Sequence, residues 1–93
     1  MEFTRVEGKR PVSLKLYTLS TCGWCRKTKA LLDELGLGYD YLDIDRLPVA
    51  EMTQARETVL GWNPNCSFPT IVVNDKECVV GFKEALIRGW GEQ

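Results

Sequence analysis

Cys22 and Cys25 lie three residues apart, at the point where the hydrophobic pattern of the chain changes from that of a strand to that of a helix. Residues 12–18 alternate with a period of two, which predicts a strand. From Gly23 to Leu35, apolar residues recur every three or four positions, which predicts a helix that stops at Gly36. The two cysteines are therefore expected at a strand-to-helix junction, with Cys22 at the helix cap and Cys25 about one turn inside.

The rest of the chain predicts three more strands and two more helices. In chain order these are a strand at 38–44, a helix from Pro48, a loop at 61–65, a strand at 70–73 buried on both faces, a tight turn at 74–76, a strand at 77–80 and a helix at 82–90. The expected apolar stripes are Val49, Met52, Ala55, Val59 and Leu60 in the second helix and Phe82, Ala85, Leu86 and Trp90 in the third. The order β-α-β-α-β-β-α predicts an α/β fold, with a four-stranded mixed sheet flanked by three helices.

Length and charge limit the number of domains and the kinds of partner. With 93 residues the chain has room for one core, which we expect at residues 12–93, after a flexible N-terminal segment at residues 1–11. A net charge of −1 gives no electrostatic reason to expect nucleic acid or an anionic membrane as a partner. The apolar runs are too short to span a bilayer, and the polar N-terminus lacks a signal-peptide segment. We therefore expect a cytoplasmic monomer.

The counts of cysteine and histidine limit the chemistry. Four cysteines in a cytoplasmic chain are not expected to form a structural disulfide framework, because the cytosol keeps such thiols reduced. The absence of histidine excludes Ser-His-Asp and Cys-His catalysis, and it excludes every metal site that depends on histidine ligands. A mechanism therefore has to use thiols, carboxylates, amines and backbone dipoles.

Three interpretations of the Cys22–Cys25 pair are open. As a reactive dithiol, the pair has a spacing that suits a disulfide, and the unpaired N–H groups at the helix start stabilise a thiolate. Positive potential on the same helix comes from Arg26, Lys27 and Lys29. A metal site needs two more ligands, but Cys66 and Cys78 do not form a second closely spaced pair. Inert core sulfurs are the third interpretation. We favour the dithiol, because a strand-to-helix junction is more often exposed than the middle of an element.

Pro69 is the second feature that points to a site. It lies in the sequence Ser67-Phe68-Pro69-Thr70, at the mouth of the predicted strand at 70–73. A proline there costs no ladder hydrogen bond if it stands at the start of the strand. The preceding residue is then held extended, which leaves the backbone of Phe68 free to pair with an extended substrate. The alternative is an ordinary turn proline.

With these features in place, the sequence resembles the glutaredoxins, a family of thioredoxin-fold redoxins. The resemblance runs from Val12 to Trp90, and four segments carry it: LKLYTLSTCGWC at 14–25, LDID at 42–45, SFPTIVVND at 67–75 and ECVVGFKEAL at 77–86. It implies a thioredoxin-like fold in which Cys22 attacks disulfides and Cys25 resolves the mixed disulfide, so that the oxidised form holds a Cys22–Cys25 disulfide. It also implies a cis peptide bond before Pro69.

The resemblance further implies where a substrate or a thiol would bind. The turn whose backbone N–H groups would hold a glutathione carboxylate falls at Gly81, Phe82 and Lys83. The whole expected binding surface consists of Thr21, Gly23, Trp24, Ser67, Phe68, Pro69, Gly81, Phe82 and Lys83. Trp24 is expected either to contact protein substrates or to pack at the helix start.

Several positions depart from the family's pattern. Gly23-Trp24 stands where many glutaredoxins have Pro-Tyr, and Leu19 stands where many have a lysine that pairs with glutathione. Ser67-Phe68-Pro69 replaces Thr-Val-Pro, and Val80-Gly81 replaces Gly-Gly. No arginine stands close before Ser67 to replace the missing lysine. The dithiol chemistry is therefore expected to carry over, whereas glutathione is expected to be a poor or non-exclusive reductant. The Val-Gly-Phe stretch and the missing lysine are also similar to redoxins that serve ribonucleotide reductase.

The expected function is that of a thiol-disulfide oxidoreductase acting on protein disulfides or mixed disulfides. We expect no bound cofactor or metal, and recycling by glutathione or another low-molecular-weight thiol, or by a flavoprotein of the thioredoxin-reductase type. The alternative is an iron–sulfur protein in which Cys22 from two chains holds a shared cluster. Outside the pair, we expect Cys66 and Cys78 to be small buried hydrophobes, and Asp43 and Asp45 to cap the loop before the second helix.

Overall fold

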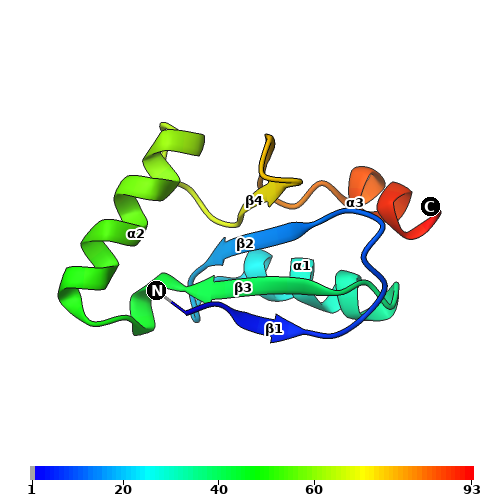
Figure 1. Cartoon of the computed structure of the whole chain (residues 1–93), viewed down its shortest axis with the longest axis horizontal. Coiled ribbons are helices and arrows are strands. Elements are labelled where there is room, and N and C mark those ends of the chain that lie inside the picture. Colours follow the sequence, from blue (N-terminus) through cyan, green and yellow to red (C-terminus); the bar gives the residue numbers. More distant parts are fainter. Residues whose placement is uncertain (1) are drawn as a thin grey trace.

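The computed structural model describes residues 2–93. In chain order its elements are β1 (Thr4–Val6), β2 (Leu14–Thr18), α1 (Gly23–Glu34), β3 (Tyr39–Asp43), the short 3-10 helix η1 (Ile44–Arg46), α2 (Val49–Trp62), β4 (Thr70–Val73), β5 (Glu77–Val80) and α3 (Glu84–Gly91). The strands form one sheet in the order β1-β3-β2-β4-β5. β2 and β3 run parallel, and every other neighbouring pair in the sheet is antiparallel (Figure 1). The predicted α/β fold with a mixed sheet and three helices is confirmed.

The sheet separates two hydrophobic clusters, because successive residues of a strand point to opposite faces. The cluster under α1 and α3 includes Leu14, Leu16, Leu32, Ile71 and Ile87. The cluster under α2 includes Tyr17, Leu42, Ala55, Val59 and Val72. All four residues of β4 are buried, as predicted for a strand covered on both faces. This packing fixes β2, β4 and α1 relative to one another, and it therefore positions the loops where β2 ends and β4 begins.

The sheet has five strands, so the prediction of four was wrong. The additional strand, β1, lies within the N-terminal segment that was expected to be loose. It pairs antiparallel with β3, with Thr4 opposite Tyr41 and Val6 opposite Tyr39. Its three residues, Thr-Arg-Val, are too few and too polar to show the alternation or the apolar run by which a strand is predicted, and they are mostly exposed.

The helices differ from the prediction at their ends and in their buried faces. α2 continues through Trp62, so residues 61 and 62 belong to the helix rather than to the loop. Ala55 and Val59 are buried as predicted, but 79% of Val49 and 47% of Leu60 are exposed. α3 starts at Glu84 and buries Ile87 and Trp90, whereas Ala85 and Leu86 are exposed. α3 thus begins two residues later than predicted, and its buried face contains Ile87 in place of Ala85 and Leu86. No helix in the described part of the chain has the length and apolar character needed to cross a membrane.

Candidate active site

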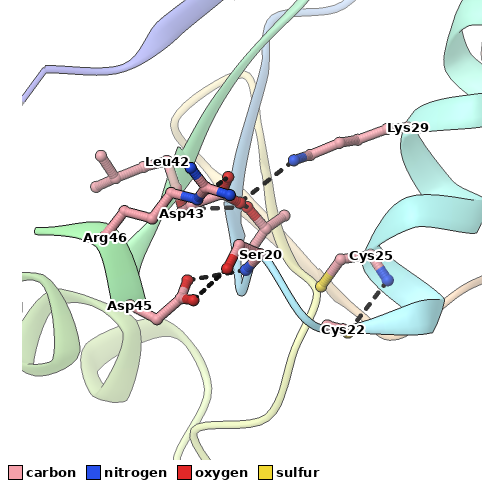
Figure 2. Close-up of polar contacts among 9 residues, drawn as sticks. Ser20, Cys22, Cys25, Lys29, Leu42, Asp43, Asp45 and Arg46 are labelled. Atoms are coloured by element: carbon pink, nitrogen blue, oxygen red, sulfur yellow. Dashed lines mark hydrogen bonds and ion pairs between the residues drawn. The ribbon is translucent and has the colours of Figure 1, made fainter.

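Cys22 is the N-cap residue of α1, as predicted. Its backbone is extended (φ −83°, ψ 117°), and its Sγ accepts a hydrogen bond from the backbone N–H of Cys25 at 3.2 Å (Figure 2). The backbone N–H of Cys22 donates to the carbonyl of Leu19 at 3.1 Å, which closes the turn before the helix. The first turn of α1 contains no acidic residue. The sulfur of Cys22 therefore stands where a helix favours an anion, with no carboxylate of that turn competing for the position.

The two thiols differ in exposure. Cys22 is half-buried, whereas only 1% of Cys25 is exposed. Burial, followed by a hydrogen bond with Cys22, raises the pKa of the Cys25 thiol to about 12. Cys25 is therefore protonated at neutral pH and shielded from large molecules. An incoming disulfide meets Cys22 first, which agrees with the predicted order of attack.

The loop before β4 lies against Cys22. The Phe68–Pro69 peptide bond is cis, as the resemblance implied, and Pro69 is fully buried. The Cys22 thiol donates toward the carbonyl oxygen of Phe68 at 3.9 Å, a long contact that a substrate group is able to replace. The carbonyl of Pro69 accepts a hydrogen bond from the N–H of Gly81 at 2.9 Å, which ties the turn after β5 to this loop. Gly81 has a φ of +83°, a conformation that favours glycine.

A buried amide, Asn63, organises the same loop and was not predicted. Asn63 is 3% exposed, and its Nδ2 donates to the Ser67 carbonyl, the Ser67 hydroxyl and the Thr70 hydroxyl at 3.2, 3.0 and 3.1 Å. The Thr70 hydroxyl donates to the Ser67 carbonyl at 2.7 Å. In the sequence Asn63 stands in a stretch rich in turn residues, so nothing distinguished it from a solvent-facing loop residue. Its site-forming role is visible only after α2 and β4 have been placed.

An aromatic rim borders Cys22 on one side. Trp24 is 57% exposed and stacks on Phe82, with ring centroids 5.9 Å apart and an interplanar angle of 28°. Together with Phe68 and Gly81, these rings line a hollow of about 200 Å³. The structure therefore brings together four residues of the predicted binding surface. The exposure of Trp24 agrees with a contact surface for substrates rather than with packing at the helix start alone.

The remaining residues of the predicted surface lie around this hollow rather than in it. Thr21 and Gly23 are exposed at the start of α1, and the Thr21 carbonyl accepts a hydrogen bond from Arg26 at 3.4 Å. Ser67 is exposed on the loop that Asn63 holds. Lys83 lines a separate shallow groove of about 830 Å³ between β5 and the start of α3.

A second hollow, on the α2 side of Phe68, contains a cation that was not predicted. Its volume is about 180 Å³, and it is lined by Leu19, Ile44, Asp45, Met52, Arg56 and Phe68. In the sequence no arginine stands close before Ser67, but the fold brings Arg56 to the hollow that Leu19 also lines. Arg56 lies eleven residues before Ser67 in the chain, but α2 carries it to the same hollow as Leu19.

Asp43 at the end of β3 and Asp45 in η1 were predicted to cap the loop before α2, but most of their side-chain contacts lead elsewhere. Asp43 precedes η1 but makes no cap hydrogen bond; its Oδ1 instead accepts one from the Thr18 hydroxyl at 2.6 Å and lies 3.3 Å from Lys29 Nζ (Figure 2). Asp45 accepts hydrogen bonds from the N–H of Ser20, at 2.8 Å, and from the Ser20 hydroxyl. Each carboxylate thus reaches back to β2 or the loop after it.

The other two cysteines are half-buried rather than fully buried. Cys66 packs against the cluster under α2 and has a φ of +48°, and Cys78 lies on β5, where burial raises the pKa of its thiol. Across residues 2–93, no three or more side chains of cysteine, aspartate or glutamate gather into a group suited to a metal ion. The alternative of a cluster shared by two chains draws ligands from outside one chain, so it stays a prediction.

Comparison with known proteins agrees with this geometry. A model of the glutaredoxin family matches residues 14–78, which include both cysteines and the cis proline. The crystal structure of the glutaredoxin from Methanosarcina mazei Go1 is 44% identical and covers 98% of this chain and 88% of its own, with a TM-score of 0.85. Methanosarcina acetivorans methanoredoxin is 45% identical, covers 84% of this chain and 82% of its own, and has a TM-score of 0.79.

A relative of known sequence supports the same assignment. It is an uncharacterised glutaredoxin-like 8.6 kDa protein in the rubredoxin operon of Clostridium pasteurianum, 32% identical over 74 residues that make up 80% of this chain and 91% of that protein. The family model spans well over half of the chain and includes Cys22, Cys25 and Pro69. The chain therefore has the thioredoxin-like fold and belongs to the glutaredoxin family.

Proposed function

We propose that the protein is a dithiol oxidoreductase that reduces protein disulfides or mixed disulfides through Cys22 and Cys25. Membership of the glutaredoxin family supports thiol-disulfide chemistry of this kind. The observation that carries the assignment of roles is the difference in exposure, with Cys22 half-buried at the helix cap and Cys25 1% exposed beneath it. An accessible thiol next to a shielded one is what a two-step exchange requires.

The reaction proceeds in two exchanges. The Cys22 thiolate attacks one sulfur of the substrate disulfide; a bond forms between Cys22 and that sulfur, and the other substrate sulfur leaves as a thiol after taking a proton. Cys25 then attacks Cys22 Sγ, which forms the Cys22–Cys25 disulfide and releases the second substrate thiol. The backbone N–H of Cys25, 3.2 Å from Cys22 Sγ, stabilises the anion before the first attack.

The proposed reductant is a low-molecular-weight thiol that carries an anionic group, or a flavoprotein reductase that docks on the exposed face of Trp24. The hollow that contains Leu19 and Arg56 supports the first possibility, because it offers a guanidinium beside apolar walls, although the carboxylate of Asp45 also lines it and opposes part of that attraction. Glutathione, with two carboxylates, is one such thiol but is not expected to be preferred, because Leu19 adds no second cation there.

The roles of the two cysteines are tested by comparing single serine variants in two assays. Cys22→Ser should lose all thiol exchange, because it removes the only accessible thiol at the helix cap. Cys25→Ser should lose reduction of protein disulfides but keep exchange with mixed disulfides, where an external thiol resolves the intermediate. Cys66→Ser serves as the matched control and should keep both activities. Activity in Cys22→Ser together with complete inactivity in Cys25→Ser would reverse the assignment.

A further inference from the structure

The second exchange makes a demand on Cys25 that its surroundings oppose. Only a thiolate attacks a disulfide, so Cys25 has to lose its proton when it attacks Cys22. Yet Cys25 is 1% exposed, and burial is the main reason that the pKa of its thiol is raised. No histidine is available as a base, so the Cys25 thiolate has to be favoured by a backbone hydrogen bond at Leu19 and by nearby positive charge.

Lys29 supplies a positive charge on the same face of α1. It lies four residues after Cys25, which places the two side chains next to each other on the helix. Figure 2 shows both side chains extending from α1 toward the sheet. Only 21% of the Lys29 side chain is exposed, and its charge acts to lower the pKa of Cys25. The charge of Lys29 favours the Cys25 thiolate, but in the free protein burial and the contacts with Cys22 outweigh it.

Two residues of β3 hold the ammonium group in this position. Lys29 Nζ lies 3.3 Å from Asp43 Oδ1 and 3.7 Å from the centre of the Tyr41 ring. A lysine at an unconstrained position would extend into water instead. Arg46 Nε lies 3.9 Å from the other oxygen of Asp43. Asp43 is therefore shared by two cations, so its single charge does not neutralise both of them.

We propose that Lys29, held by Asp43 and Tyr41, is a positioning residue for the resolving step, in which its charge stabilises the Cys25 thiolate that attacks the Cys22 mixed disulfide. The proposal rests on the proposed function. In this step the Cys25–Cys22 sulfur bond forms, the bond from Cys22 to the substrate sulfur breaks, and the substrate sulfur leaves with the electron pair and takes up the proton that Cys25 lost. No further oxidant or base is consumed.

The state of Cys22 makes the role of Lys29 specific to this step. In the free protein, a hydrogen bond with Cys22 and the charge of Cys22 both add to the raised pKa of Cys25. Once Cys22 is bonded to the substrate sulfur, it carries no negative charge, so that repulsion disappears. Lys29 is unaffected by the bond and continues to favour the Cys25 thiolate.

The test separates the two exchanges by stopped-flow absorbance with the uncharged disulfide dithiodipyridine. In a Cys66→Ala Cys78→Ala background, attack by Cys22 releases one thiopyridone and resolution by Cys25 releases a second. Lys29→Met should slow the second release at pH 7 about tenfold and move its pH midpoint upward, while the first release stays nearly unchanged. Lys29→Arg should keep the midpoint close to that of the parent, because it keeps the charge. Lys76→Met removes a lysine from the exposed turn between β4 and β5 and should change neither release.

Two results would overturn the proposal. One is a second release in Lys29→Met with the same rate and pH midpoint as in Lys76→Met. The other is a Lys29→Arg variant as slow as Lys29→Met, because the side chain would then act by its shape rather than its charge. A parent protein that releases only one thiopyridone would contradict the proposed function instead, so the two failures are distinguishable.

Discussion

Leu19 and Arg56 line the hollow in which we propose that a small thiol is held. Both line the hollow on the α2 side of Phe68, where Leu19 contributes an apolar wall and Arg56 a guanidinium. A hydrogen bond between charged groups contributes about 1.5–3 kcal/mol, which is enough to make one donor about tenfold better than another. The exchange at the sulfur atoms discriminates little among thiols, so preference for a donor depends on contacts of this kind.

We predict that Arg56→Gln lowers kcat/KM for the anionic thiols glutathione and coenzyme M about tenfold or more, and that Leu19→Lys raises it for glutathione. The measurement uses one disulfide substrate and several donors. Dithiothreitol, which has no charge, is the control and should be affected by neither change. If glutathione outperforms every other donor in the wild type and Leu19→Lys brings no gain, the description of this hollow is wrong.

The hydrogen bonds between Asp45 and Ser20 make the stability of the loop before Cys22 depend on pH. Hydrogen bonds from the hydroxyl and then the N–H of Ser20 hold the pKa of Asp45 below its ordinary value of 3.8. A carboxyl group with a lowered pKa in the folded state contributes stability that is fully present above its unfolded pKa and is lost as the pH falls through the folded pKa. Because Asp45 is exposed, the contribution is small.

We predict that Asp45→Asn lowers the free energy of unfolding by about 0.2–1 kcal/mol near neutral pH. The difference from wild type should shrink as the pH falls below 3.8 and disappear once Asp45 of the wild type is protonated. Denaturant titrations at several pH values provide the measurement, and Ser20→Ala should show a weaker version of the same pH dependence. A difference that grows toward acidic pH would show that the sign of the linkage is wrong.

At the scale of secondary structure, elements with a strong local pattern were predictable. The alternation that forms β2, the apolar spacing of α1 and the apolar run of β4 each identify their element, and the turn at 74–76 identifies the hairpin. β1 was not predictable, because its stability comes from pairing with β3 and not from its own three residues. The exposed stripe residues of α2 show a related limit, because a helix face is buried only where the sheet reaches it.

The candidate site was predictable only where its residues adjoin a motif. Cys22, Cys25 and Pro69 were identified because each stands at the end of a predicted element. Asn63 and Arg56 were missed because they reach the site across the fold, and polar or charged residues in a loop or on a helix are usually solvated. Such residues are found only from the packing of α2 against the sheet.

At this scale we predict that the loop between α2 and β4 depends on Asn63 for its stability. Asn63→Ala removes the Nδ2 contacts with Ser67 and Thr70 and the Oδ1 acceptor of the Asn65 N–H, so we expect the free energy of unfolding to fall by about 1–3 kcal/mol. Thiol exchange should fall as well, because Phe68 and Pro69 lose their support. Asn65→Ala, two residues away on the exposed side of the loop, is the matched control and should stay within about 0.5 kcal/mol of wild type. Equal stability of the two variants would mean that the amide does not organise the loop.

At the scale of the whole molecule, the fold brings three distant segments to one end of the sheet. These are the cap of α1 with Cys22, the cis-proline loop before β4 and the turn at Gly81-Phe82 after β5. The contacts that join them are Cys22 Sγ to the Phe68 carbonyl, the Gly81 N–H to the Pro69 carbonyl, and the stack of Trp24 on Phe82. The result is one accessible thiol within an apolar rim, with the second thiol buried beneath it.

The central claim, that Cys22 attacks and Cys25 resolves, is tested most directly by trapping the intermediate and locating it. Cys25→Ser is mixed with a peptide disulfide, quenched with acid and N-ethylmaleimide, and mapped by mass spectrometry after digestion. We predict that the peptide is bonded to Cys22, and that wild-type protein treated in the same way holds a Cys22–Cys25 disulfide and no peptide. A peptide bonded chiefly to Cys66 or Cys78, or a Cys22→Ser variant that captures it at Cys25 as fast as Cys25→Ser does at Cys22, would contradict the account.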